Sequence, residues 1–409
     1  MAQQAAPPLH LSKKTLEWAL KHVVREGDTD VFPRPFELDI IEKNQQEVIK
    51  DLRSIAINTH QWMGPRRIIV PKTELSFRPV HQLDPYDAIL YAGIVRDIGS
   101  RIERRRSPAK ENNVFSYRFK PTISGRLYSK NSKNSGWEDF WKKSEMRSSH
   151  SSHVLCTDIS DYYNQIYHHT IENQLDLSKI DRGYWHALKN LFANVTEGVS
   201  RGIPIGPHPS HLIAELAMIP VDEFLASQNV QFCRYVDDIH VFGRSADEIH
   251  EILFKLVDFL DKSQKLQINR QKTKIYRAEA FREICKQNLV DRPINELENQ
   301  MISAVRRYTS SPYERITLRK ISQSDIKNLS SENINSVLRA YINAKDVDYI
   351  RLRWFIRRLA QVGAPGGVDF IVDNFSDFVP CAAEVGQYFE AAGPNYEGDW
   401  KLIGFKLLK

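Results

Sequence analysis

The clearest pattern along the chain is a pair of short runs, rich in aromatic and β-branched residues, that flank two adjacent acids. The runs cover residues 232–236 and 239–242, and Asp237 and Asp238 stand between them. This composition around a short polar break predicts a β-hairpin with both carboxylates at or beside its turn. Side chains alternate across a strand, but a tight turn relaxes that rule and lets adjacent acids approach one ion.

A predicted buried strand precedes this hairpin, and helices and a further strand accompany it. The strand runs from Val154 and ends in Asp158, residues 166–195 have helical patterning, and 246–260 predict an amphipathic helix. Residues 266–276 then predict a strand-like edge rich in cations. The order strand, helices, antiparallel hairpin, helix, strand predicts a split βαβ sheet with helices on one face.

The pattern divides the chain into four predicted parts. Residues 1–60 form an N-terminal helical segment, and 61–153 contain a strand pair, a helix and a serine-rich loop on either side of a helical turn. Residues 154–290 contain the acidic motifs, and 291–409 are helical segments broken by polar turns, one of them basic and amphipathic. We therefore expect an α+β fold followed by an all-helical C-terminal domain.

Composition narrows the class of protein only a little. The 409 residues carry a net charge of +6, a mild basic bias that suits a polyanionic partner and that many proteins without one share. The four cysteines lie far apart, so we expect free thiols in a reducing compartment rather than disulfides. The start of the sequence lacks a signal-peptide core and no run has the length of a membrane helix, so we expect a cytoplasmic protein without a membrane partner.

The acids fit metal-assisted phosphoryl transfer. Two divalent ions roughly 3.5–4 Å apart need carboxylates from more than one strand to hold the attacking and leaving oxygens. Asp158 would join Asp237 and Asp238, although Asp158 alone has the alternative role of a helix N-cap. Two pairs of histidines lack a third metal ligand at a suitable spacing, so we expect no zinc site there. These pairs are His150 with His153 and His208 with His211.

Three other stretches suit an anionic ligand, although each also has an ordinary structural explanation. Lys72 and Arg78 flank a predicted turn and could reach one phosphate, but such cations are usually solvated. The arginines within 101–106 form either a phosphate contact or a solvated helix end. The Gly/Pro-rich loop 200–209 lets a nucleotide approach the backbone, or is an ordinary connection, and Ser210 is suited to cap the helix that follows.

Taken in order, these motifs resemble those of the reverse transcriptases. The resemblance covers roughly residues 60–285, and several motifs in the right order are far more specific than any one. The segments that carry it are Asp158-Ile-Ser-Asp-Tyr-Tyr, Gly202-Ile-Pro-Ile-Gly-Pro-His-Pro-Ser, Tyr235-Val-Asp-Asp, Leu266 to Thr273 with its Asn-x-x-Lys-Thr, and Pro71-Lys72 with Arg78.

The resemblance implies a right-hand polymerase, with fingers over 61–153 and palm over 154–290, followed by a helical thumb-like or repeat-like domain. It implies an RNA-directed DNA polymerase that adds dNTPs to an RNA or DNA template-primer. Asp158, Asp237 and the carbonyl of Ile159 would bind two Mg²⁺ ions, with Mn²⁺ as the alternative ion.

The remaining site residues also follow from the resemblance. Asp238 would complete or orient the metal shell, and Lys72 and Arg78 would hold the β- and γ-phosphates of the dNTP. Gly206 belongs to the substrate-binding loop, and Tyr163 matches the bulky position that excludes a 2′-hydroxyl. Lys272 is a candidate general acid for the leaving pyrophosphate, with a solvated strand-edge lysine as the alternative. These roles imply a preference for deoxynucleotides.

One departure from the family pattern points to a particular branch. The usual Pro-Gln-Gly is here Pro204-Ile205-Gly206, which with the Pro-His-Pro-Ser that follows is similar to the bacterial defence-associated enzymes of abortive infection and the unknown groups. Members of that branch synthesise DNA in antiphage defence, some without an ordinary template and some from a protein hydroxyl. Template-independent or protein-primed synthesis is therefore an alternative to templated copying.

A further alternative is a catalytically silent scaffold that binds nucleic acid. The presence of all three acids argues against it, because crowded carboxylates cost electrostatic energy that a silent relative need not sustain. The partners that the sequence leaves open are a dedicated non-coding RNA, a second polymerase subunit and a second copy of the chain.

Overall fold

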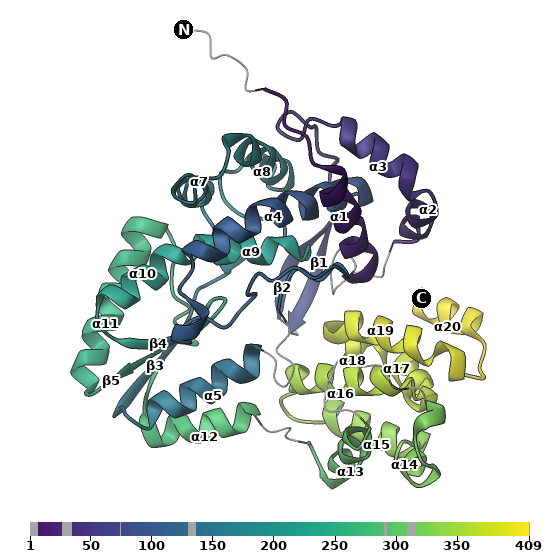
Figure 1. Cartoon of the computed structure of the whole chain (residues 1–409). Coiled ribbons are helices and arrows are strands. Elements are labelled where there is room, and N and C mark those ends of the chain that lie inside the picture. Colours follow the sequence, from purple (N-terminus) through teal and green to yellow (C-terminus); the bar gives the residue numbers. More distant parts are fainter. Residues whose placement is uncertain are drawn as a thin grey trace. The chain divides into compact units, whose positions relative to one another are not determined.

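A computed structural model describes residues 7–26, 35–73, 75–129, 136–289, 293–308, 316 and 318–408, without the side chains of Lys72, Thr73 and Arg319. The chain divides into two compact units, whose elements are labelled in Figure 1. The first unit comprises Met1–Thr29, Arg34–Arg67 and Val80–Val290, and the second comprises Asp30–Pro33, Ile68–Pro79 and Asp291–Lys409.

The first unit is built on a four-stranded antiparallel sheet. Its strands are β3 (His153–Asp158), β4 (Gln231–Tyr235), β5 (Asp238–Gly243) and β6 (Lys274–Arg277), in the order β4-β5-β3-β6. Neighbouring strands are antiparallel, so β3 and β4 run parallel with β5 between them, and β5 and β6 run parallel with β3 between them. This topology confirms the predicted split βαβ sheet within an α+β fold.

Helices cover both faces of this sheet. They are α10 (Ile219–Ser227) and α11 (Ala246–Phe259) on one face, and α5 (Gly136–Ser148) and α12 (Ala278–Leu289), which lie side by side, on the other (Figure 1). Leu155 and Val241 join the main core beneath α11, whereas Val154 and Phe242 pack with Phe281 of α12. The expectation of helices on one face is wrong, because consecutive apolar residues of a strand point to opposite faces and both then need cover.

Among the other helices of the first unit, α4 packs against α1 and α9 and is buried along much of its length, because residues 88–95 are apolar or small. Asp84 caps α4 by accepting a hydrogen bond from the Tyr86 amide at 2.9 Å. The bounds are α1 (Lys13–Glu26), α2 (Glu37–Lys43), α3 (Gln45–Ser54), α4 (Pro85–Arg105), α6 (Tyr162–Gln165), α7 (His168–Leu177), α8 (Arg182–Val195) and α9 (Pro209–Ala217).

The second unit combines helices with part of a two-stranded hairpin. The hairpin is β1 (Arg66–Thr73) with β2 (Ser76–Gln82), and the helices are α13 (Glu296–Arg306), α14 (Gln323–Asn328), α15 (Ser331–Ile342), α16 (Tyr349–Val362), α17 (Val368–Asp373), α18 (Phe375–Phe378), α19 (Ala382–Ala392) and α20 (Trp400–Leu407). Leu338, Phe355 and Tyr388 are buried in a core of its own. From residue 293 onward, the described residues contain helices and turns but no strand, as predicted for the C-terminal region.

The predicted basic amphipathic helix is α16, and its arginines have partners inside the second unit. Arg357 donates to Glu384 at 2.8 Å and Arg353 donates to the carbonyl of Pro380 at 2.6 Å. Arg351 pairs with Asp348 at 3.1 Å. These contacts fasten α16 to neighbouring helices and turns.

The cysteines form no disulfide, as the sequence predicts. All four cysteines are free, and three of them are buried. In the ranges that the structure describes, no helix is both long and apolar enough to cross a membrane.

Buried His240 makes the sheet sensitive to acid. Its imidazole stacks on Phe140 with 4.4 Å between ring centroids and shares a 2.9 Å hydrogen bond with Ser144. Burial lowers the pKa of His240 to about 3. An unfolded histidine binds a proton below about pH 6.5, so the folded state loses stability as the pH falls from there toward 3.

We expect His240→Gln to flatten this acid dependence, because glutamine can still bond to Ser144 but cannot titrate. For each unit by which the pH falls, the free energy of unfolding of the variant should decrease by up to about 1.4 kcal/mol less than that of the wild type. Urea unfolding between pH 4 and 7 measures the slope, and His150→Gln at an exposed position is the matched control. An unchanged slope in the His240 variant would contradict this account.

Candidate active site

The predicted hairpin is formed by β4 and β5, and its turn has only two residues. Tyr235 pairs with Asp238 across the ladder, so Val236 and Asp237 alone connect the strands. Val236 has a φ of 55°, in the left-handed region that β-branched residues rarely adopt. Such a conformation costs about 1–3 kcal/mol and persists only where surrounding contacts impose it.

Asp158 ends β3 directly opposite this hairpin. It is the last residue of the β3–β5 register, in which its partner is Asp238. Residues opposite each other in a ladder share a face of the sheet, with Cβ atoms about 4.5–5.5 Å apart. Asp158 is buried and is not a helix N-cap, since α6 begins only at Tyr162. The structure therefore brings Asp158 and Asp238 together, with Asp237 next to them in the turn.

Lys272 supplies the positive charge among these carboxylates. Its Nζ donates a hydrogen bond to Oδ2 of Asp158, and the Asn269 amide donates to the Asp158 carbonyl at 2.7 Å. Partial burial would lower the pKa of Lys272, but the bond to Asp158 and the charges of Asp158, Asp238 and Asp237 outweigh it, so the pKa lies above its usual value. The segment Leu266 to Thr273 thus contacts the segment that begins at Asp158.

The donor atoms of this site suit a hard divalent cation. Carboxylate and carbonyl oxygens are the ligands that Mg²⁺ prefers. The Ser160 amide donates a hydrogen bond to the Gln267 carbonyl, and the Asn269 amide donates one to the Asp158 carbonyl. The Ile159 carbonyl takes part in neither of these two hydrogen bonds. Across the described residues, no three His, Cys, Asp or Glu side chains are grouped closely enough to hold a metal. Because Lys272 bonds to an oxygen of Asp158, a cation bound here would compete with that ammonium.

The predicted glycine loop is fastened by a buried histidine. Gly206 has a φ of 121°, which glycine adopts without strain. The His81 amide donates to the Ile205 carbonyl at 2.7 Å, and the Ile205 amide donates to Nδ1 of His81 at 3.2 Å. Burial and the charge of Arg67 lower the pKa of His81 to about 4, so its ring is neutral and Nδ1 can accept. The loop therefore has a fixed backbone at Ile205.

The expectation that Ser210 caps the next helix is wrong. α9 begins at Pro209, with His208 at the N-cap position and no side-chain cap. Ser210 lies in the first turn and is fully buried, where its hydroxyl bonds to Tyr91 at 3.2 Å. Pro209 at the first helical position needs no partner for its nitrogen, which explains how α9 begins without a side-chain cap.

Tyr163 lies close to the acidic turn and is held by a histidine. Its hydroxyl bonds to Nδ1 of His211 at 2.7 Å, and His211 stacks on Tyr117 with 3.9 Å between ring centroids. Burial raises the pKa of Tyr163 well above its usual value, and the charge of Asp237 adds to the rise. Tyr163 is therefore a neutral phenol whose orientation is fixed near Asp237.

Lys72 and Arg78 lie in a different unit of the chain from the carboxylates. Both lie in the β1–β2 hairpin, whose residues Ile68–Pro79 belong to the second unit, whereas the carboxylates belong to the first. Arg78 is exposed, and the side chain of Lys72 lies outside the described part of the structure. Their contact with a triphosphate remains a prediction.

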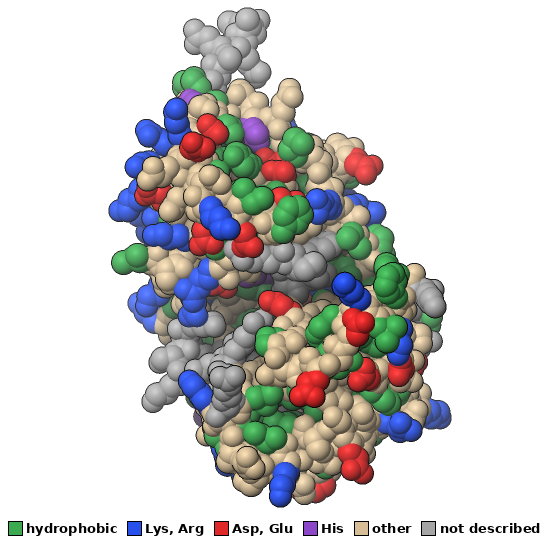
Figure 2. Space-filling view, turned by 90° about the vertical axis from the view of Figure 1, so that its right-hand side faces the viewer, with side chains coloured by type: hydrophobic (Ala, Val, Ile, Leu, Met, Phe, Trp, Pro, Cys, Tyr) green, Lys and Arg blue, Asp and Glu red, His purple; other side chains and the backbone are tan. Residues whose placement is uncertain are grey.

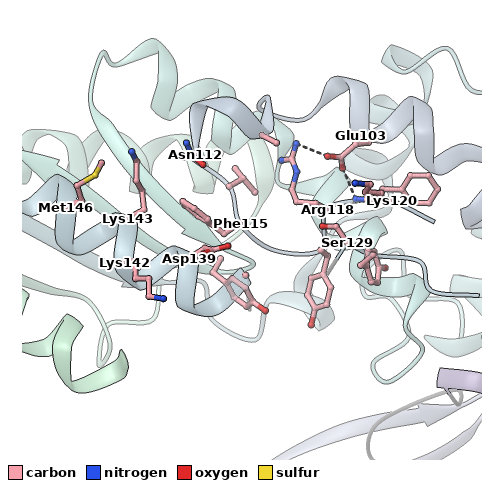
Figure 3. A pocket seen from close by; sticks show the side chains of 17 residues that line it. Glu103, Asn112, Phe115, Arg118, Lys120, Ser129, Asp139, Lys142, Lys143 and Met146 are labelled. Carbon is pink, nitrogen blue, oxygen red and sulfur yellow. Dashed lines mark hydrogen bonds and ion pairs between the residues drawn. The ribbon is translucent and has the colours of Figure 1, made fainter. Parts of the chain in front are cut away.

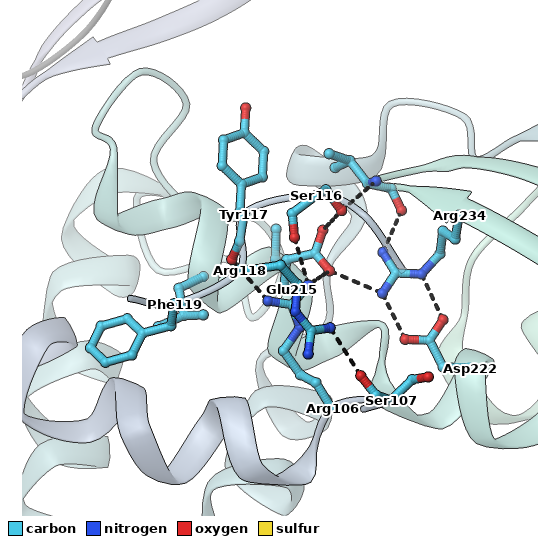
Figure 4. A network of polar contacts seen from close by, with 12 residues as sticks. Arg106, Ser107, Ser116, Tyr117, Arg118, Phe119, Glu215, Asp222 and Arg234 are labelled. Carbon is cyan, nitrogen blue, oxygen red and sulfur yellow. Dashed lines mark hydrogen bonds and ion pairs between the residues drawn. The ribbon is translucent and has the colours of Figure 1, made fainter. Parts of the chain in front are cut away.

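Sequence reasoning missed a network of buried charges behind the turn (Figure 4). Arg106, Ser116, Glu215, Asp222 and Arg234 come from separate segments and are all buried. Arg234 binds Asp222 through two hydrogen bonds of 2.6 and 2.7 Å, and Arg106 binds Glu215 at 2.6 Å. Arg106 is therefore neither a phosphate contact nor a solvated helix end. A charged residue inside an apolar strand, such as Arg234, was the signal that could have revealed this network.

A groove of about 860 Å³ lies beside the hairpin and was also missed (Figure 3). Its lining includes the aromatic residues Phe115, Tyr117, Tyr128 and Tyr235 and the cations Arg118, Lys120, Lys142 and Lys143. A basic lining with aromatic surfaces is suited to single-stranded nucleic acid. Figure 2 shows one side of the molecule, on which lysine and arginine side chains gather along the left-hand edge of the view.

Comparison with known proteins places this site in a family. Residues 89–339, more than half of the chain, match the family described as reverse transcriptase (RNA-dependent DNA polymerase). No curated protein matches the sequence. One similar solved structure is telomerase from Candida albicans in complex with a TWJ fragment of telomeric RNA, with a TM-score of 0.41 and 12% identity over 87% of this chain and 71% of that chain. Another is apo telomerase from Candida tropicalis, with a TM-score of 0.43 and 10% identity over 81% of this chain and 63% of that chain. The family match shows that the chain belongs to the reverse transcriptases.

Proposed function

We propose that this reverse transcriptase extends a nucleic-acid 3′ end with deoxynucleotides by two-metal phosphoryl transfer. The observation that carries the proposal is the pairing of Asp158 with Asp238 beside the turn that holds Asp237. Opposed carboxylates destabilise a sheet unless a cation offsets their charge. Bound divalent cations would offset the repulsion between Asp158 and Asp238, so this pairing suits an enzyme that uses such ions.

Asp158, Asp237 and the carbonyl of Ile159 would hold two Mg²⁺ ions, with Mn²⁺ as an alternative. When bound, the ions lower the pKa of the attacking 3′-hydroxyl and neutralise charge on the leaving pyrophosphate. Asp238, fixed by its place in β5, would orient the shell. Lys272, whose ammonium is protonated at neutral pH, would give a proton to the leaving pyrophosphate once it leaves Asp158.

The substrates would be dNTPs and a template-primer of RNA or DNA. Tyr163, held by His211, would exclude a 2′-hydroxyl, and Gly206 would let the nucleotide approach the backbone. Lys72 and Arg78 would bind the β- and γ-phosphates. The groove beside Tyr235 is suited to an unpaired strand of the template-primer.

Ile205 supports a second candidate, synthesis without a template or from a protein primer. A reverse transcriptase usually has glutamine at this position, whereas here an apolar residue is fixed through its backbone to His81. The same sequence resembles the defence-associated branch, so we propose a role in antiphage defence. A dedicated RNA, a second polymerase subunit or a second copy of the chain are proposed partners of that role.

Polymerisation should depend on the acids, and its template requirement should separate the two candidates. Purified, nuclease-treated protein is incubated with Mg²⁺ and labelled dNTPs, with and without added RNA and primer. Loss of metal ligands in Asp158→Asn or in the Asp237→Asn/Asp238→Asn double variant should lower incorporation by about 10³-fold or more. The measurement is labelled product resolved on gels that retain protein-linked DNA.

Asp161→Asn is the matched control, because Asp161 is exposed and its φ of 46° suits asparagine equally well. Product only with added RNA supports templated copying, and product without it supports the second candidate. Incorporation that survives Asp158→Asn would contradict the proposed site. If cells that carry the Asp237→Asn/Asp238→Asn double variant remain protected against phage, the result would favour a catalytically silent scaffold.

Removing Lys272 should strengthen divalent-cation binding, because its ammonium competes for Asp158. We expect Lys272→Gln to bind Mn²⁺ about two- to five-fold more tightly, as befits a partly exposed ion pair. Electron paramagnetic resonance of Mn²⁺ measures this without nucleotide. Lys274→Gln, at an exposed position of β6, is the control. Unchanged or weaker binding in the Lys272 variant would refute the competition.

A further inference from the structure

The peptide groups of Val236 are tied to the buried network on both sides. Its amide donates to Oγ of Ser116 at 2.9 Å, and its carbonyl accepts from Nη1 of Arg234 at 2.8 Å. Both contacts are buried, and Val236 is the residue with the left-handed backbone at the turn. The contacts that impose this conformation are therefore identifiable (Figure 4).

The two residues that hold Val236 are themselves fixed. Arg234 is bound by Asp222 and, at 3.0 Å, by Glu215. Ser116 donates to Glu215, and its carbonyl accepts from Arg106 at 2.7 Å. Burial would raise the pKa of Glu215, but Arg234 and Arg106 outweigh it and hold the pKa below its usual value. The network therefore contains two cations and two acids, and it joins α9 and α10 to the catalytic hairpin.

The conformation of Val236 bears on Asp237 more than on the other acids. Asp158 and Asp238 are placed by the β3–β5 ladder. Asp237 lies in the turn and follows Val236 directly, so rotation about the Val236 backbone redirects the Asp237 side chain. If Val236 left this conformation, Asp158 and Asp238 would keep their places in the β3–β5 ladder. The side chain of Asp237 would turn away from them.

We propose that Ser116 and Arg234 are positioning residues, which hold Val236 in its left-handed conformation so that Asp237 faces Asp158 and completes the divalent-cation site. This inference rests on the proposed metal site and goes beyond it, because it assigns cation affinity to residues that touch neither metal nor substrate. A network that merely stabilised the fold would lower the melting temperature of its variants without changing their affinity for the cation.

Glycine at position 236 separates these two roles. Glycine adopts a positive φ without strain, so the turn would need less support from Ser116. We therefore compare Ser116→Ala in the wild-type background with Ser116→Ala in the Val236→Gly background. Mn²⁺ affinity is measured by electron paramagnetic resonance on protein without nucleotide or nucleic acid, and thermal melting checks the fold of each variant.

Ser116→Ala should weaken Mn²⁺ binding about three- to ten-fold in the wild-type background, because the Val236 amide loses its buried hydrogen bond to the Ser116 hydroxyl. In the Val236→Gly background the same change should weaken it by less than about two-fold. Ser148→Ala, which removes another buried hydroxyl whose bond goes to the Glu145 carbonyl, should leave Mn²⁺ affinity unchanged.

Equal loss in both backgrounds, or a lower melting temperature with unchanged Mn²⁺ affinity, would overturn the inference. Asp158→Asn keeps that failure distinct from failure of the proposed function. Where Asp158→Asn abolishes Mn²⁺ binding and Ser116→Ala acts alike in both backgrounds, only the positioning role fails. Where Asp158→Asn binds Mn²⁺ as the wild type does, the metal site itself is refuted, and the inference with it.

Discussion

The proposed active site of the first unit depends on holding carboxylates close together although their negative charges repel each other. Asp158 and Asp238 face each other across β3 and β5, and Asp237 is the next residue along the turn. Opposed like charges destabilise a sheet. Lys272 offsets part of that cost through its hydrogen bond to Asp158, and the charges of Asp237 and Asp238 remain in excess of this one ammonium. A surplus of carboxylate charge is what a divalent cation needs.

The sheet and its two layers of helices keep these acids in register. A slip of one residue in β3 would move Asp158 to the opposite face, because side chains alternate along a strand. α11 covers one face and α5 and α12 cover the other, so apolar residues at consecutive positions of β3 are buried. Strand pairing therefore places Asp158 opposite Asp238, whereas Ser116 and Arg234 form hydrogen bonds to Val236 in the turn between β4 and β5.

Local patterns were enough to predict the hairpin, the strand that ends in Asp158 and the helical C-terminal region. Each of these depends on residues that are close in sequence, and the meeting of Asp158 with the hairpin follows from strand order. α5 was expected as one helical turn in a serine-rich loop, because its buried face uses Ser144 and Ser148 as well as Phe140 and Trp141. Small polar residues hide such a face from a hydrophobic pattern.

Arg234 signals a buried charge, but two members of its network could not be predicted, because Arg106 and Ser116 lie 109 and 99 residues from Glu215. Arg106 belonged to a run of arginines with the composition of a solvated helix end, yet its side chain is buried against Glu215. Only tertiary structure shows which member of such a run faces inward. For the same reason, no local signal related Ser116 to the backbone of Val236.

The central claim is that Asp158 and Asp237 form the metal site of a polymerase. Anomalous scattering from crystals grown with Mn²⁺ and a non-hydrolysable dNTP tests it most directly. The account predicts Mn²⁺ between the carboxylates of Asp158 and Asp237, with the Lys272 ammonium moved from Asp158 toward the phosphates. A bound dNTP whose Mn²⁺ lies away from both carboxylates, with Lys272 still on Asp158, would contradict it.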